Sequence, residues 1–328
     1  MSTQPFNCRI CNSKKATDWT FREMMFGLKH QFKYKECNNC GCIQIEAYPK
    51  NIADYYPDNY YSFNSHISSK YKFIGKVERI KTRVLLYNHL VFKDVIGAIG
   101  KRTFPPFRYN LQFLQSIDLK PSGKILDIGC GNGEFLLQLY KSGFTNLTGI
   151  DKFIKEDLFL FNKIHIWKKE IIDLKTKYDL ITMHHVFEHM HNQEAVLKSI
   201  QTILKSNGNL IIRIPIVNEP WKIYRENWVQ LDAPRHYYLH SMDSFKLLAK
   251  NAGFIVTDIV FDSYALQFWG SEQYKMDIPL RNDKRSYAEN QEPSIFSSLQ
   301  ISEWENKSIE LNNNSKGDQA IFYLRKNG

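Results

Sequence analysis

Two short stretches of the chain concentrate side chains that can move protons. The first holds four ionisable groups within six residues, His184, His185, Glu188 and His189, and the second is Asp232-Ala-Pro-Arg-His236, followed by Tyr237. Imidazoles and carboxylates are the usual general acids and bases of enzymes, and a guanidinium such as Arg235 can bind a phosphate through two parallel hydrogen bonds. Packing, capping and turn formation are the alternatives, but ionisable groups this dense indicate a site.

Five of the six cysteines lie within the first 42 residues, where they form two close pairs. Cys8-x-x-Cys11 and Cys37-x-x-Cys40 have the spacing of a four-thiolate zinc site, and aromatic residues between the pairs can fill a small core. Four cysteines leave no open coordination position, so the predicted zinc is structural. Cys42 is a spare that can replace Cys40. Free buried thiols are the alternative, whereas disulfides are disfavoured because the first residues lack an export signal.

A glycine-rich loop follows a predicted strand and precedes a predicted helix. Residues 124–128 form an apolar run with the length of a buried parallel strand. The helix is predicted from the spacing of four side chains, Phe135, Leu136, Leu139 and Tyr140. Gly129, Gly131 and Gly133 allow a sharp turn and a close approach of a ligand to the backbone. Strand, loop and helix predict the first unit of a doubly wound α/β sheet, where ligands bind at the carboxyl ends of the strands.

The details of this loop select its ligand. A dinucleotide fingerprint needs its third glycine where Glu134 stands, and the Gly-Lys-Ser/Thr of a P-loop does not follow. The next predicted strand, residues 146–150, leads to Asp151, 18 residues after Gly133. A carboxylate at that strand end can accept both hydroxyls of a ribose, although capping of a helix is the other interpretation. The Asp127-x-Gly-x-Gly-x-Gly133 pattern resembles the first motif of class I S-adenosylmethionine (SAM) dependent methyltransferases.

The resemblance implies a seven-stranded Rossmann-like α/β sheet that binds SAM. It implies cofactor contacts from eight residues, Asp127, Gly129, Cys130, Gly131, Gly133, Asp151, Glu170 and His185. Further strands are predicted over 163–167, 178–183, 209–216, 254–261 and 320–324. The last two are expected to form the antiparallel hairpin that closes such a sheet.

The segment His185-Val-Phe-Glu-His189 resembles the His/Glu-x-x-Glu-His element of two methyltransferase groups. One group is the sugar C-methyltransferases, which also begin with a four-cysteine zinc module, and the other is the ubiquinone-type O-methyltransferases. The segment ending at His236 strengthens the resemblance to bacterial enzymes of surface-polysaccharide and sugar pathways. The resemblance implies a catalytic base among Glu188, His189 and His236, with Arg235 and Tyr237 facing the substrate.

Three regions are predicted along the chain. Residues 1–62 form a small zinc-ribbon-like module with a tyrosine-rich segment, 63–118 a helical linker, and 119–328 the methyltransferase domain. Insertions are expected at 218–240 and, as an irregular polar segment, at 264–318. A helix is expected over 241–252, with Ser241 as its N-cap and Gly253 as its stop.

Charge narrows the partners less than the motifs do. The net charge of +10 favours an anionic partner, and the basic segment 70–83 is a solvated face or a contact for an anionic membrane. RNA is disfavoured because the chain lacks a recognised RNA-binding signature and the Asn/Asp-Pro-Pro-Tyr type of motif. Without a long apolar run, a cytoplasmic protein is expected, able to reach the inner face of the membrane.

The expected substrate is a nucleotide- or lipid-linked sugar in surface-polysaccharide or secondary-metabolite biosynthesis. A ubiquinone-type small-molecule O-methyltransferase and an RNA methyltransferase that grips its substrate through the zinc module are the alternative enzymes. A scaffold without activity is disfavoured because the loop glycines and Asp151 are intact.

Overall fold

The computed structural model describes residues 5–57, 111–117, 119–292 and 294–328, and these residues form two compact units. The first unit comprises Met1–Pro57, His185–Leu197 and Ile212–Asn327, and the second comprises Asp58–His184 and Lys198–Ile211. The predicted basic segment 70–83, most of the predicted helical linker and the end of the tyrosine-rich segment lie outside the described residues.

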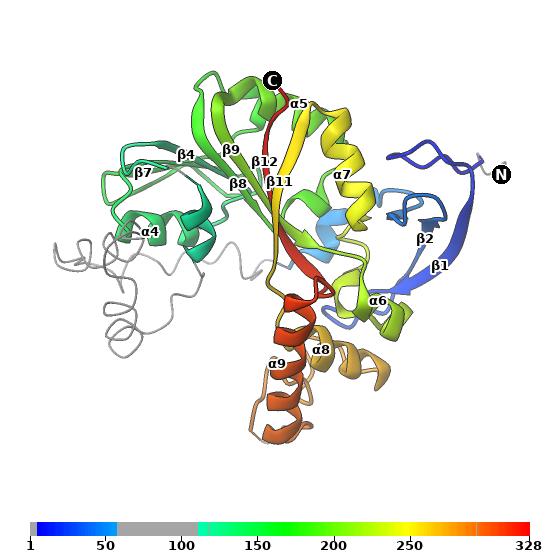
Figure 1. The fold of residues 1–328 in the computed structure, drawn as a ribbon. Coiled ribbons are helices and arrows are strands. Elements are labelled where there is room, and N and C mark those ends of the chain that lie inside the picture. The colour runs from blue at the N-terminus through cyan, green and yellow to red at the C-terminus, as the bar shows by residue number, and fades with distance from the viewer. Residues whose placement is uncertain (1–4, 58–110, 118, 293) are drawn as a thin grey trace. The chain divides into compact units, whose positions relative to one another are not determined.

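The larger sheet confirms the predicted α/β fold. Its strand order is β11-β12-β9-β8-β4-β5-β7-β6 (Figure 1). The strands span Lys124–Ile128 (β4), Asn146–Ile150 (β5), Leu158–Leu160 (β6), Ile164–Trp167 (β7), Tyr178–His184 (β8), Leu204–Pro215 (β9), Phe254–Phe261 (β11) and Gln319–Lys326 (β12). Strands β8, β4, β5 and β7 are parallel, whereas β6 on β7 and β11 on β12 are antiparallel. The sheet has eight strands rather than the expected seven because the three-residue β6 adds to its edge.

The central strands are apolar because both of their faces are covered. Ile125, Leu126, Leu180 and Ile181 are all 0% exposed, as parallel strands between helical layers require. Two helices of the α/β pattern, α4 over Glu134–Lys141 and α5 over Gln193–Ile203, follow β4 and precede β9.

A second, four-stranded sheet contains the cysteine-rich region. Its order is β1-β2-β3-β10, with strands at Ala16–Arg22, Gln31–Cys37, Ile43–Ile45 and Tyr238–Leu239. Strands β1 and β2 form an antiparallel hairpin, drawn in blue in Figure 1. Strand β10 belongs to the expected insertion 218–240, so this insertion completes the sheet of the N-terminal region instead of forming a free loop.

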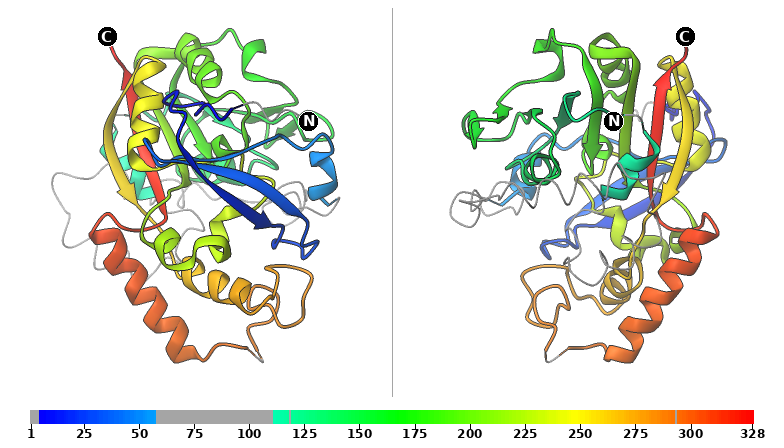
Figure 2. Two further views of the ribbon diagram at one scale, coloured as in Figure 1. Left: turned by 90° about the vertical axis from the view of Figure 1, so that its right-hand side faces the viewer. Right: turned by 60° about the vertical axis from the view of Figure 1, so that its left-hand side comes forward.

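The C-terminal part contains more helix than the sequence predicts. Helix α7 (Met242–Asn251) begins after Ser241, whose Oγ accepts a hydrogen bond from the Ser244 N–H, as predicted. The expected irregular segment 264–318 contains α8 (Leu266–Lys275) and α9 (Ser298–Asn313) (Figure 2). Helix α9 buries only Ser308 and Leu311, so it lacks the apolar stripe from which a helix is predicted.

The remaining elements are short. They are α6 at Glu219–Tyr224 and 3-10 turns at Ile52–Tyr55, Leu111–Ser116, Ile171–Asp173, Phe187–His189, Arg225–Asn227 and Val229–Leu231. Among the described residues, the helices are too short or too polar to span a bilayer.

Candidate active site

The glycine loop after β4 has the backbone geometry that its glycines predict. Gly129, Gly131 and Gly133 have φ angles of 70°, 51° and 83°, in the left-handed region. A Cβ on Gly133 would also lie 2.3 Å from the Ile166 Cδ1 atom. Only glycine therefore fits at this position, where helix α4 begins directly after the loop.

The carboxylate of Asp151 holds this loop. Its Oδ2 atom accepts a hydrogen bond from the Gly131 N–H at 3.0 Å, and its Oδ1 atom accepts one from the Phe153 N–H at 2.8 Å. Asp151 thus stabilises the loop that it was predicted to serve with a ligand contact. Each oxygen keeps a second lone pair, so a ribose hydroxyl can share the same carboxylate.

Other predicted cofactor residues occupy different environments. The Cys130 side chain is 9% exposed, and its Sγ lies 2.4 Å from the position of a Cβ on Gly149, so this residue presents only its backbone to a ligand. Glu170 is exposed and caps a 3-10 turn, in which its N–H donates to Asp173. His185 directly follows β8 with a φ of 54°, and its N–H donates to the Arg213 carbonyl at 2.9 Å.

Asp127 is a buried acid next to the glycine loop. It is 3% exposed at the end of β4, and its Oδ1 atom accepts a hydrogen bond from the Thr182 hydroxyl at 2.8 Å. The contact follows from the parallel register, which pairs Asp127 with Thr182. Burial raises the pKa of Asp127 to about 7, although the hydrogen bond from Thr182 lowers it.

Within the first unit, the two predicted proton-transfer segments meet. Glu188 and His189 lie in the 3-10 turn after β8, and the Tyr237 N–H donates to the Glu188 carbonyl at 2.9 Å. The rings of His189 and His236 are 4.7 Å apart in an edge-to-face arrangement. The Glu188 carboxylate lies 3.5 Å from the His185 Nδ1 and 3.9 Å from the His236 Nε2.

Backbone carbonyls orient both imidazoles. The Nδ1 of His189 is 2.8 Å from the Arg235 carbonyl oxygen, and the Nδ1 of His236 is 2.8 Å from the Gln230 carbonyl oxygen. Because a carbonyl can only accept, each Nδ1 carries the hydrogen and each neutral ring keeps its lone pair on Nε2.

The electrostatics of this cluster favour an ionised carboxylate and a neutral imidazole. Burial by itself would raise the pKa of Glu188, but the contact with His185 and the nearby His189 and His236 hold this pKa at about 2. Burial lowers the pKa of His189, and His236 lowers it further.

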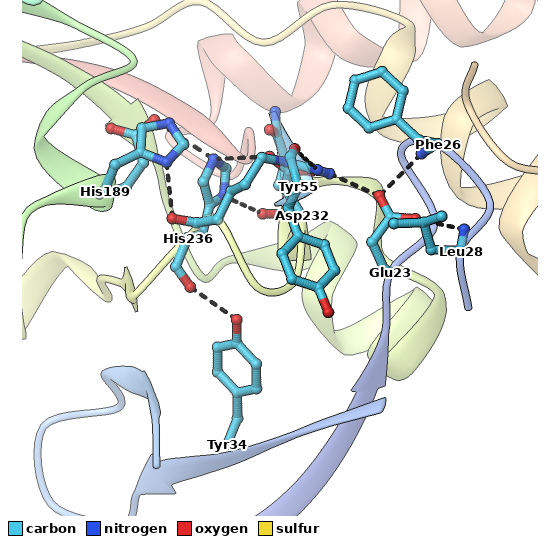
Figure 3. Close-up of polar contacts among 11 residues, drawn as sticks. Glu23, Phe26, Leu28, Tyr34, Tyr55, His189, Asp232 and His236 are labelled. Atoms are coloured by element: carbon cyan, nitrogen blue, oxygen red, sulfur yellow. Dashed lines mark hydrogen bonds and ion pairs between the residues drawn. The ribbon is translucent and has the colours of Figure 1, made fainter. Parts of the chain in front are cut away.

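Arg235, predicted to bind a phosphate, instead holds two protein carboxylates. It is 0% exposed, and its guanidinium donates to Asp232, to Glu23 at 3.0 Å and to the Tyr55 carbonyl at 2.8 Å (Figure 3). Glu23 in turn accepts from the backbone N–H groups of Phe26 and Leu28. We therefore assign Arg235 to positioning the segment 232–236, because no donor of its guanidinium is directed at solvent.

Two further side chains of the motifs are packed against rings. Tyr237, predicted to face the substrate, is 4% exposed, with its ring 4.9 Å from that of Tyr48 and 4.6 Å from that of His191. His184 lies at the end of β8 in the second unit, and its ring contacts those of Phe113 and Phe135. These two residues contribute packing.

The four predicted cysteines come together in the first unit. Their Sγ atoms lie within 4.8 Å of one another, with 3.6 Å between Cys8 and Cys40 and 3.5 Å between Cys11 and Cys37. Thiolates at the Zn–S distance of about 2.3 Å in a tetrahedral site are about 3.8 Å apart, so the cluster fits a zinc ion. Cys40, not the spare Cys42, completes this group.

Comparisons with known proteins identify the domain. A family model described as a methyltransferase domain matches residues 101–259, which include the glycine loop and Asp151. Residues 101–259 form a SAM-dependent methyltransferase domain.

Relatives of this methyltransferase domain are distant. Phosphoethanolamine N-methyltransferase 1 of Zea mays is 25% identical over 215 residues, which are 62% of this chain and 41% of the maize protein. Phosphoethanolamine N-methyltransferase 3 of Arabidopsis thaliana is 22% identical over 275 residues, 78% of this chain and 52% of that protein. The chain therefore spans about half the length of these relatives, or less. Among solved structures, the mycolic acid cyclopropane synthase CmaA1 has a TM-score of 0.43 and 16% identity, covering 66% of this chain and 82% of that one.

The substitution Asp151→Ala is expected to weaken SAM binding by the methyltransferase domain at least tenfold. It removes the predicted ribose acceptor and also the partner of the Gly131 N–H. Titration calorimetry with SAM and S-adenosylhomocysteine measures the effect, and the exposed Glu156→Ala is the matched control. An unchanged affinity of Asp151→Ala would remove the ribose contact from this description.

The buried Asp127 is expected to make the stability of the protein depend on pH. Its folded pKa of about 7 exceeds the unfolded value of about 3.9, so between these values the folded state holds a proton that the unfolded state has lost. Stability is then fully present below about pH 4 and falls as the pH rises to about 7. Asp127→Asn should gain about 2–4 kcal/mol relative to the wild type between pH 4 and pH 8. Urea unfolding at both pH values tests this, and an equal difference at both would contradict it.

Sequence reasoning missed the groups that support the two histidines. Glu23 lies after β1, 212 residues from its partner Arg235, and nothing in the local sequence distinguishes it from a surface acid. The carbonyl of Gln230 and the hydroxyl of Tyr34, which donates to the His236 carbonyl at 2.9 Å (Figure 3), give no signal either. Asp232 could have been found, because it stands in the quoted motif.

Proposed function

We propose that this protein transfers the methyl group of SAM to a nucleotide- or lipid-linked sugar. The observation that carries the proposal is the meeting of Glu188, His189 and His236. The two segments that resemble those of sugar-pathway methyltransferases supply these groups from positions 47 residues apart, between His189 and His236. The four-cysteine cluster in the same unit supports the same resemblance, and the net charge of +10 suits a phosphate-bearing acceptor.

The geometry supplies the proton transfer that this reaction needs. SAM brings a methyl group on a good leaving group, so the protein has to align an acceptor with this methyl group and take up the proton. The Nε2 lone pairs of His189 and His236 and the ionised Glu188 are the proton acceptors of the cluster. A base of this kind contributes about 10²–10⁴-fold to a rate.

Alanine variants of these three residues are expected to bind SAM normally and to lose turnover by about 10²–10⁴-fold. Titration calorimetry and a methyl-transfer assay separate the two effects, and His165→Ala on strand β7 is the control outside the cluster. Near wild-type rates in all three variants would mean that the base lies elsewhere.

We also propose structural zinc on Cys8, Cys11, Cys37 and Cys40. The Sγ separations support it, as does the Gln44 amide, which donates to the Cys8 Sγ at 2.9 Å. Activated sugars are made in the cytoplasm or on its membrane face, so we propose that location, with the basic segment 70–83 as the contact to anionic lipid.

A second candidate acceptor is a small phosphorylated amine. The observation that favours it is the similarity to the maize and Arabidopsis proteins, whose names give phosphoethanolamine as their substrate. Like a sugar nucleotide, this acceptor carries a phosphate, but the atom that receives the methyl group is nitrogen.

One assay separates these acceptors. The protein is incubated with methyl-labelled SAM and, in parallel, with a panel of nucleotide sugars, with phosphoethanolamine and with total RNA. Transfer to a nucleotide sugar is expected, with weak dependence on salt, whereas RNA methylation would fall steeply as salt is added. Label in RNA or in phosphoethanolamine but in none of the sugars would overturn the sugar assignment.

A further inference from the structure

Glu188 is a buried carboxylate whose oxygens accept no hydrogen bond from the described residues. Its side chain is 1% exposed, and both Oε1 and Oε2 are fully enclosed without a hydrogen-bond donor. The nearest polar atoms are the His185 Nδ1 at 3.5 Å and the His236 Nε2 at 3.9 Å, beyond ordinary hydrogen-bond length. A buried charge without donors is costly, so this position calls for a cation.

Two imidazoles direct electron pairs at the same place. Backbone carbonyls accept from the Nδ1–H groups of His189 and His236, which leaves the Nε2 lone pairs for another partner. Histidines that ligate metals nearly always donate their other ring N–H to a carbonyl or carboxylate in this way. Figure 3 shows the two rings beside each other, each linked to a neighbouring group.

The three side chains already stand close to coordinating separation. One ligand atom from each of Glu188, His189 and His236 lies within 4.8 Å of the others. Two ligands on opposite sides of one ion are about 4.2 Å apart at a metal–nitrogen distance of about 2.1 Å. Small side-chain rotations are enough to bring the three atoms onto a single ion.

We propose that Glu188, His189 and His236 bind a divalent first-row transition ion, in a second metal centre distinct from the four cysteines. Two imidazoles and one carboxylate suit zinc, iron or cobalt and leave coordination positions open. An acceptor oxygen bound at an open position would lose its proton more easily. That role rests on the proposed methyl transfer, whereas binding of the ion does not.

A proton is the competing occupant of this cluster. The His236 Nε2 also lies 3.7 Å from the Asp232 Oδ2, so a protonated His236 would pair with two carboxylates. The ion is favoured because the His189 Nε2 faces the same place and a proton on His236 leaves it without use. The two occupants differ in what they displace, and cobalt distinguishes them directly.

The test titrates Co²⁺ into the full-length protein after saturation with zinc and removal of the excess. The expected result is one Co²⁺ per chain, with weak visible bands of a nitrogen- and oxygen-ligated ion. The intense near-ultraviolet band of sulfur-bound cobalt should not develop, because thiolates are absent from this centre. No binding, or binding only with the sulfur band, would overturn the proposal, and neither outcome depends on methyl transfer.

Variants then locate the ion. Glu188→Gln and His236→Gln should each weaken Co²⁺ binding at least tenfold, in line with the loss of one of three ligands, while His165→Gln should bind like the wild type. Retained zinc shows that each variant is folded, and Glu188→Asp is the substitute if the glutamine variant is not. Undiminished Co²⁺ binding by folded variants at both Glu188 and His236 would also refute the site.

Discussion

Replacing Cys11 by serine is expected to release the zinc ion and to destabilise the four-stranded sheet. Structural zinc contributes about 10–16 kcal/mol of apparent binding free energy to small domains, and a serine hydroxyl does not ionise to replace the lost thiolate. The Cys11 Sγ lies 3.5 Å from that of Cys37, so the substitution opens the cluster between the N-terminal turn and the end of β2. We expect less than one tenth of a zinc ion per chain and a loss of several kcal/mol in urea unfolding.

The matched control for this prediction is Cys42→Ser. Cys42 is fully buried next to the cluster, but it is not one of the four converging thiols, and its Sγ donates to the Ile43 carbonyl. This variant should keep its zinc. SAM binding should survive Cys11→Ser, because the glycine loop and Asp151 belong to the other compact unit. Purified wild-type protein without zinc and with all thiols titratable would contradict the metal assignment.

Replacing Arg235 by methionine is expected to cost about 3–5 kcal/mol of stability, the range for breaking a buried ion pair from one side. The guanidinium is 0% exposed between Asp232 and Glu23, and methionine would leave both carboxylates buried without their partner. Turnover should fall as well, because the Arg235 carbonyl orients His189 and the next residue is His236. Urea unfolding and the methyl-transfer assay measure the two effects.

A surface arginine provides the comparison. Arg285 pairs with Asp283 in an exposed segment, and Arg285→Met should leave the urea midpoint unchanged. The double variant Glu23→Gln with Arg235→Met should be less destabilised than the two single changes added together, because the two side chains share one contact. If Arg235→Met unfolds at the wild-type midpoint, the buried pair does not support the segment.

The parts of the molecule that could be predicted are those in which function and local backbone depend on neighbouring residues. The glycine loop was predicted because Gly129, Gly131 and Gly133 directly follow an apolar run, and the position of Asp151 follows from the end of the next parallel strand. The start of α7 at Ser241 could be predicted because a cap is a contact over three residues. Helix α9 could not, because little of its surface packs against the protein and its sequence carries no stripe.

The sequence by itself determined that the chain has an α/β sheet with a nucleotide-type loop, two cysteine pairs and two clusters of ionisable groups. Tertiary structure decided what those groups do. It buried Arg235 against Glu23, brought His236 to Glu188 and His189, and chose Cys40 over Cys42. The physical reason is that spacing along the chain sets which residues share a turn or a strand end. Burial and the approach of distant segments decide whether a charge faces water, a ligand or another charge.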